Sequence, residues 1–299
     1  MKEIIKPVCI IYLTWCLAGL GLFLTGRILP EESQMQQWPE PVSAAAAILL
    51  ALFIIRFYDA RVESGIQGRH SLRIRLLFTL LAVFAGGYLF AAVTGVKSNG
   101  VNCFLTANLL FFACVLGNWM TWPLKRPAEI VPLCLVVALA DLFSVAAGPT
   151  KHLAEDLSAF YEGGMAGMPP LVDFLLVKTV VPGREVLMPL FGISDWIIVV
   201  FLSSAAAKFN MDDNIWIRGD GKMTRGLFFP VGCAGLAVSI AAAWLAGLFI
   251  PALPFVVAAF LAVMMGRYPE MRRLTKAELL PMAVVSGILI VLMAVFYIR

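Results

Sequence analysis

Two aspartates stand near the middle of apolar stretches that are long enough to cross a membrane. Asp141 lies in VPLCLVVALADLFSVAAG, and Asp195 lies in VLMPLFGISDWIIVVFLSS. A carboxylate near the centre of a spanning helix costs about 2.5–3.5 kcal/mol on insertion scales, so it usually marks a proton, ion or catalytic site. The simpler alternative is a hydrogen-bonded carboxylic acid that fixes helix packing.

The chemistry depends on whether these two carboxylates meet. In a site of low dielectric constant two adjacent carboxylates cannot both ionise easily, and they tend to share one proton. The ionised member can then take a proton from water while the protonated member polarises a carbonyl, which is how a carboxylate pair hydrolyses a peptide bond. The same pair would also suit a proton-coupled carrier. The aspartates alone therefore leave both functions open.

The composition favours an all-α, polytopic transmembrane helical bundle. Of the 299 residues, 61% are hydrophobic and 14% are charged, whereas an ordinary soluble domain carries about 25% charged residues. Uncharged runs of about 20 residues, the length that crosses the hydrocarbon core, predict about nine spans. The first is too long and too apolar for a cleaved signal peptide. The nine spans are placed at roughly 7–25, 42–58, 73–95, 102–122, 129–148, 186–208, 226–248, 251–266 and 279–298.

The longest connection between predicted spans runs from residue 149 to residue 185. Residues 150–161 have helical spacing with polar positions interleaved, and the GGMAGMPP segment after them interrupts regular structure. Residues 172–181 are rich in β-branched side chains and are followed by Pro-Gly, which predicts a short strand or a buried loop.

The distribution of basic residues predicts the orientation. With the N-terminus inside, the inner loops and the N-terminal residues hold 17 of the 23 Lys and Arg residues. This bias places the N-terminus in the cytoplasm and the 149–185 connection outside. Short loops suggest a prokaryotic plasma membrane. Because the basic residues sit in short loops, the net charge of +4 does not indicate nucleic-acid binding.

The cysteines give no sign of a metal site or a disulfide framework. All six lie in or at the edge of apolar runs and none forms a CxxC pair, which favours a packing role. We therefore expect no metal and no organic cofactor, and the sequence does not indicate an oligomeric state. The six are Cys9, Cys16, Cys103, Cys114, Cys134 and Cys233.

Three segments carry a family resemblance. They are ADLFSVAAGPTKHLAE (140–155), FGISDWIIVVFLSSAAAKFN (191–210) and PALPF (251–255). In this order they resemble the presenilin and signal peptide peptidase family of GxGD-type intramembrane aspartyl proteases, and most of all its archaeal presenilin-like members. In that family one aspartate follows a tyrosine, the second ends Gly-x-Gly-Asp, and Pro-Ala-Leu opens a later helix beside the site.

The resemblance implies a function and a set of site residues. Asp141 and Asp195 would be the catalytic pair of an intramembrane endopeptidase, and its partners would be transmembrane peptides or proteins within the lipid bilayer. Segment 172–181 would pair as a strand with an unwound substrate. N-terminal helices (1–128) would precede a catalytic core (129–266) and an extra helix (267–299). The residues expected beside the substrate are Gly192, Ser194, Pro251, Ala252, Leu253 and Pro254.

The sequence departs from the family pattern at two positions. Ala140 replaces the tyrosine before the first aspartate, and Ser194 replaces the glycine before the second. The aspartates also fall in the fifth and sixth predicted spans, where the family has them in the sixth and seventh. An outside connection between them implies the signal-peptide-peptidase orientation and type II substrates. The departures motivate an alternative, an inactive homologue that binds transmembrane helices; a proton-coupled carrier is the third possibility.

Overall fold

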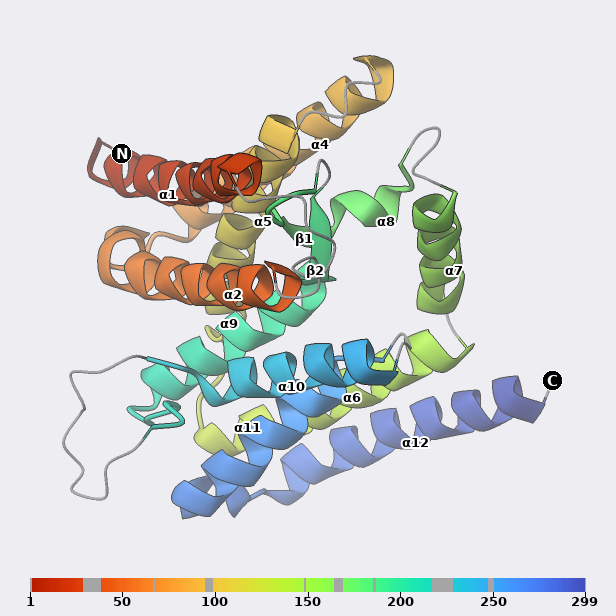
Figure 1. Ribbon diagram of the computed structural model, residues 1–299. Helices are drawn as coiled ribbons and strands as arrows, with labels where there is room; N and C mark the ends of the chain where they lie inside the picture. Colours follow the sequence, from red (N-terminus) through yellow and green to blue (C-terminus); the bar gives the residue numbers. More distant parts are fainter. Residues whose placement is uncertain are drawn as a thin grey trace. The chain divides into compact units, whose positions relative to one another are not determined.

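The fold is mostly helical. Figure 1 shows the computed structural model of the chain. The prediction of an all-α class is confirmed, and one small two-stranded hairpin is added. The residues that the structure describes are 2–28, 39–66, 68–94, 99–147, 149–163, 169–184, 187–216, 228–246 and 250–298.

Helices and strands follow one another in a simple order. The longer helices are α1 (Lys2–Ile28), α2 (Pro39–Tyr58), α4 (His70–Thr94), α5 (Asn99–Met120), α6 (Ile130–Ala147) and α12 (Lys276–Ile298). The shorter ones are α3 (Ser64–Ile66), α7 (Pro149–Glu162), α8 (Leu171–Phe174), α9 (Ile193–Lys208), α10 (Val231–Ala246) and α11 (Leu253–Arg267). The strands are β1 (Leu176–Thr179) and β2 (Met188–Gly192).

Five helical segments of the described chain are long and apolar enough to cross a membrane, as a multi-pass membrane protein requires. They coincide with the first five predicted spans. The apolar helices α10 and α11 have only 16 and 15 residues, about 22–24 Å at 1.5 Å per residue, against a hydrocarbon core of about 30 Å. The count of nine spans therefore stays a prediction. The five are Ile5–Thr25, Glu40–Ile66, His70–Ala91, Asn99–Met120 and Pro127–Val145.

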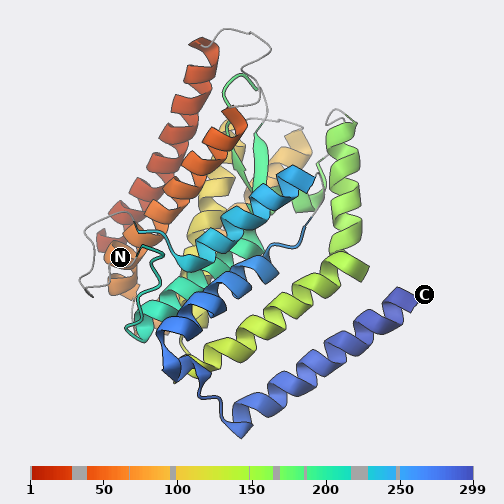
Figure 2. The ribbon, with the colours of Figure 1, turned by 60° about the horizontal axis from the view of Figure 1, so that its bottom comes forward.

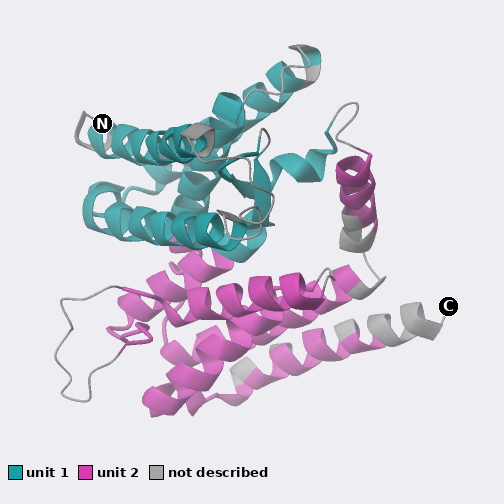
Figure 3. Cartoon of the chain, viewed as in Figure 1, with its two compact units in different colours: residues 1–116, 166–196 teal, residues 117–165, 197–299 magenta. Residues whose placement is uncertain are grey.

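The chain divides into two compact units (Figure 3). Unit 1 comprises residues 1–116 and 166–196, and unit 2 comprises residues 117–165 and 197–299. Each unit is therefore built from two stretches of chain that are distant in sequence.

In unit 1, a buried asparagine joins three helices. The Tyr12 hydroxyl on α1 donates to Asn108 Oδ1 on α5 at 2.7 Å, and Asn108 Nδ2 donates to the Leu80 carbonyl on α4 at 3.0 Å. Asn108 is buried, and a buried amide without partners would be costly. These bonds therefore favour one arrangement of α1, α4 and α5.

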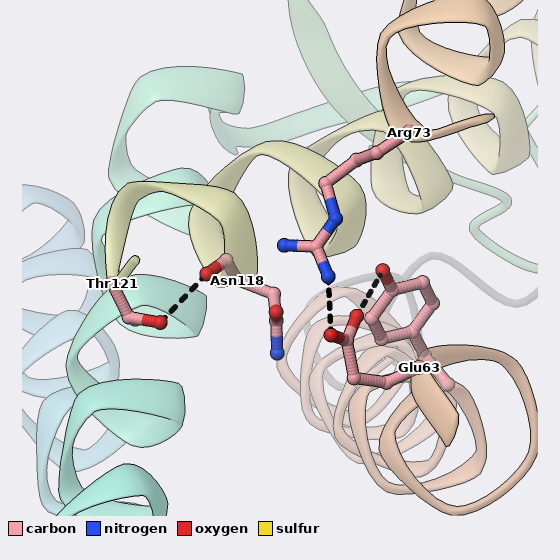
Figure 4. Close-up of polar contacts among 5 residues, drawn as sticks. Glu63, Arg73, Asn118 and Thr121 are labelled. Carbon is pink, nitrogen blue, oxygen red and sulfur yellow. Dashed lines mark hydrogen bonds and ion pairs between the residues drawn. The ribbon is translucent and has the colours of Figure 1, made fainter. Parts of the chain in front are cut away.

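A second polar network ties the end of α2 to the start of α4. Here α2 passes into a π-helical turn, η1 (Asp59–Glu63). The Tyr58 hydroxyl donates to Glu63 Oε2 at 2.9 Å, and Glu63 Oε1 forms an ion pair with Arg73 on α4 (Figure 4). Both carboxylate oxygens of Glu63 thus have a partner, which a partly buried charge needs.

The hairpin of unit 1 accounts for one correction. Of the short strand or buried loop expected over 172–181, the strand is confirmed at Leu176–Thr179 only, because Leu171–Phe174 forms the helix α8. Strand β1 pairs antiparallel with β2, with Val177 opposite Phe191 and a bulge before Lys178. The predicted helix over 186–208 is wrong at its start, because residues 188–192 form β2. Pro189 explains this, since proline has no N–H for a helix interior but is accepted in an edge strand.

Unit 2 contains two pairs of adjacent helices. Helices α10 and α11 lie side by side, and α12 runs along α6 (Figure 2). Helix α7 confirms the helical spacing of 150–161 and leaves α6 at a steep angle. The α10–α11 contact is close: a Cβ added to Gly235 would lie 2.5 Å from the Phe255 carbonyl oxygen.

Candidate active site

Asp141 lies in the last third of α6 and is half-buried. Its Oδ2 accepts a hydrogen bond from the backbone amide of Leu253, at 3.1 Å. The two residues are 112 positions apart, and both belong to unit 2. This bond joins the first predicted catalytic residue to the PALP segment.

The local structure of PALP explains why the Leu253 amide can make this bond. Ala252 is the N-cap of α11, and Leu253 is its first helical residue. Amides in the first turn of a helix have no partner within that helix, and Pro254 has no N–H to offer. The Ala252 carbonyl already accepts from Phe255 and Val256, each at 3.1 Å. The start of α11 therefore presents the Leu253 amide at its positive dipole end, where a carboxylate is favoured.

Asp195 lies in the first turn of α9, immediately after β2. Its Oδ2 accepts from the backbone amide of Gly192 at 3.2 Å. Gly192 is the residue before the helix and Asp195 its third residue, so this is the reciprocal half of a capping box. The simplest explanation of Asp195 is thus a helix cap, and a catalytic role requires that its carboxylate also reach substrate or water.

Gly192 and Ser194 lie beside this carboxylate. A Cβ at position 192 would lie 3.2 Å from Asp195 Oδ2 and 3.3 Å from Ser194 Oγ. Ser194 itself is exposed. Any larger residue at 192 would therefore press on the Asp195 carboxylate, which gives this glycine a local reason to be small.

The next residue of α9 fixes the helix against the hairpin. The Trp196 ring stacks on Phe191 of β2, with ring centroids 5.3 Å apart and an angle of 26° between the planes. Trp196 is fully buried. The indole ring thus packs against a protein side chain. The stack holds the junction between β2 and α9, where Asp195 lies.

A buried ion pair beside the hairpin was missed by sequence reasoning. Lys178 on β1 and Asp173 on α8 pair at 2.5 Å, and Lys178 Nζ lies 5.6 Å from the centre of the Phe174 ring. Burial lowers the pKa of the Lys178 ammonium, while the Asp173 carboxylate acts to raise it. Spacing could not have revealed this pair, because the turn at Leu175 lies between its members.

The remaining residues predicted to contact substrate lie at the start of α11. Pro251, Ala252 and Pro254 surround the start of α11 and are partly exposed. Asp141 belongs to unit 2 and Asp195 to unit 1, and the meeting of their carboxylates stays a prediction. Among the described residues, no three His, Cys, Asp or Glu side chains are grouped so that they could hold a metal ion.

Comparisons with known proteins add no family. No protein-family model, no curated protein and no solved structure matches this chain. The resemblance to the presenilin and signal peptide peptidase family therefore stays an expectation that rests on the three motifs.

Proposed function

We propose that this chain is an intramembrane aspartyl protease that cleaves transmembrane segments with the pair Asp141 and Asp195. The observation that supports this most is the hydrogen bond from the Leu253 amide to Asp141 Oδ2, at 3.1 Å. It joins two of the three motifs of the resemblance, although nothing in their spacing requires contact. The proposal includes nine spans, a cytoplasmic N-terminus and a prokaryotic plasma membrane.

In this proposal the carboxylates act as a base and an acid. One ionised carboxylate takes a proton from water, while the other, protonated, donates a hydrogen bond to the scissile carbonyl. The proton moves on to the leaving amine as the peptide bond breaks. No metal or organic cofactor is needed for these steps.

The substrate must also be unwound, because a helix hides its peptide bonds in its own hydrogen bonds. Exposed backbone within a membrane needs new partners. The Ile193 amide donates to the Leu175 carbonyl at 3.0 Å, while the Gly192 amide donates to Asp195. Successive amides at the end of β2 thus point to opposite sides. We propose that an extended substrate adds to the outer edge of β2; pairing with segment 172–181 remains the other possibility.

Cleavage of fluorogenic transmembrane peptides by the purified protein in lipid tests the proposal. We expect Asp141→Asn and Asp195→Asn each to abolish cleavage, and Asp156→Asn, a change on the exposed face of α7, to leave it unchanged. Cleavage that survives either of the first two changes would refute the proposed pair.

The alternative of an inactive, helix-binding homologue is motivated by Ala140 and Ser194. It predicts that wild type cuts nothing, while Ala140→Tyr with Ser194→Gly restores cutting. If no variant cuts, a binding role or a proton-coupled carrier becomes the better explanation.

Two further measurements test the arrangement. In a background without the native cysteines, the double change Asp141→Cys with Asp195→Cys should give a disulfide under mild oxidation. A disulfide forms only when the two Cα atoms come within about 7 Å, so its formation would indicate that positions 141 and 195 are neighbours. A reporter fused at residue 165 should be non-cytoplasmic. A cytoplasmic reporter would remove the proposed orientation and the preference for type II substrates.

A further inference from the structure

Helix α10 carries a glycine at the point where it meets the start of α11. A Cβ at position 235 would lie 2.5 Å from the Phe255 carbonyl oxygen and 2.7 Å from Val256 Cα. Real Cβ atoms do not approach so closely, and both neighbours are backbone atoms, which no side-chain rotation can move away. Any residue other than glycine at 235 must therefore displace one helix relative to the other.

The contact falls on the turn of α11 that supports the Asp141 hydrogen bond. Phe255 and Val256 both donate their amides to the Ala252 carbonyl, so they form one hydrogen-bonded turn with Leu253 between the two ends. Leu253 is 7% exposed and is thus held by packing on its other sides. A shift of Phe255 and Val256 would carry the Leu253 amide with it.

We infer that Gly235 is a positioning residue for Asp141. By allowing the backbone of α10 to touch the first turn of α11, it holds the Leu253 amide within 3.1 Å of the Asp141 carboxylate. The backbone atoms nearest to a Cβ at 235 all belong to α11, so we expect Gly235 to act on Asp141 through this helix. The expected effect on cleavage rests on the proposed function. The placement of the Leu253 amide by Gly235 does not.

The same helix provides a matched control one turn away. A Cβ at Gly232 would meet Val256 Cγ1 at 3.6 Å and Leu202 Cδ1 at 3.7 Å, which are ordinary side-chain contacts. Gly232→Ala and Gly235→Ala therefore add the same methyl group to α10, but only the second collides with backbone.

Leucine-selective ¹⁵N labelling of the full chain in lipid nanodiscs gives a readout that does not depend on activity. The Leu253 amide signal, identified by its loss in Leu253→Ile, should move when Asp141→Ala removes the acceptor. We expect this response in wild type and in Gly232→Ala. In Gly235→Ala the signal should already be displaced, and Asp141→Ala should move it no further. A full response in Gly235→Ala would overturn the inference.

Two measurements on chains with glycine at 235 keep the inference testable if Gly235→Ala does not fold. A nuclear Overhauser effect should connect the α-protons of Gly235 and Val256. The Leu253 signal should respond to Asp141→Ala. The absence of either would overturn the inference.

Cleavage kinetics separate this inference from the proposed function. A misplacement of about 1 Å at a reacting group can cost about 100-fold in rate, so Gly235→Ala should lower kcat by tenfold or more with KM little changed. Gly232→Ala should stay within about twofold of wild type. A wild-type chain that cuts nothing would count against the protease, while the amide signals would still decide whether Gly235 positions Leu253.

Discussion

Lys178 Nζ lies 2.5 Å from Asp173 Oδ2, with side-chain exposures of 7% and 6%. This pair ties α8 to β1, and β1 is paired with the strand that leads into the Asp195 helix. A buried pair of charges is weak evidence for added stability, because both have lost their hydration. The pair nevertheless constrains the fold, because removing either member alone leaves the charge of the other buried.

The first prediction concerns the loss of one member. Asp173→Ala should lower the free energy of unfolding by about 3–5 kcal/mol, because Lys178 is left as an uncompensated buried charge. Denaturant unfolding in detergent micelles, followed by tryptophan fluorescence, measures this. The double change Asp173→Leu with Lys178→Met should recover most of the loss. A double variant as unstable as the single one would show that packing, and not the charge, accounts for the cost.

The second prediction is a pH dependence. Burial lowers the pKa of Lys178 from its usual value of 10.5, and Asp173 opposes this lowering. Asp173→Asn should therefore lower it further. Between the folded and unfolded pKa values the unfolded chain binds more protons, so the free energy of unfolding rises with pH. The stability deficit of Asp173→Asn relative to wild type should thus shrink as pH rises towards 10, by at most about 1.4 kcal/mol per pH unit.

A control variant isolates the lysine. Asp173→Asn combined with Lys178→Met should show no such recovery, because the titrating amine is gone. If the deficit of Asp173→Asn is constant from pH 6 to pH 10, Lys178 does not carry the proton that the prediction requires.

The helices could be predicted from sequence because apolar length is a local property. The first five predicted spans coincide with helices because each is a predominantly apolar stretch close to the length that crosses the hydrocarbon core. Strand β2 was missed because a five-residue apolar run, MPLFG, looks the same at the start of a helix or in a strand. Pro189 was the available signal, since proline is unfavourable within a helix.

The polar contacts could not be predicted in the same way, because they depend on which distant segments meet. Asp59 lies three residues after Arg56, a spacing typical of a solvated surface pair, yet its Oδ1 is buried. Asp213 lies between helices in a polar segment, where a solvated side chain is the usual expectation, but it is 5% exposed. The Leu253 amide reaches Asp141 across 112 residues. The motifs indicated that the two segments are neighbours, and only the fold showed which atoms bond.

The third prediction concerns a close helix contact in unit 2. A Cβ at Gly117 on α5 would lie 2.8 Å from the Ile197 carbonyl oxygen and 2.9 Å from Val200 Cβ on α9. Gly117→Ala should therefore cost about 1–3 kcal/mol through overpacking. Gly86→Ala on α4 is the control, since no heavy atom lies within 4 Å of its Cβ position. It should be neutral or stabilise by about 0.5–1 kcal/mol. Equal thermal midpoints for the two variants would contradict the contact.

The fourth prediction concerns Lys208, the last residue of α9. Its ammonium donates to the carbonyls of Thr121, Trp122 and Leu124, at 2.8, 3.1 and 2.7 Å. An ammonium has three donors and no acceptor, so the turn after α5 uses all of them. Lys208→Met keeps the length of the aliphatic stem but removes this donor group.

We expect Lys208→Met to lower the free energy of unfolding by about 1.5–3 kcal/mol, the range for hydrogen bonds to a charged group. Lys125→Met, a change at an exposed lysine in the adjacent loop, should stay within about 0.5 kcal/mol of wild type. Hydrogen exchange gives a local readout, because the amides of Thr121 and Leu124 belong to the turn that Lys208 caps. They should exchange faster in Lys208→Met and not in Lys125→Met. Unchanged exchange at both amides would mean that the turn is held by its own backbone bonds.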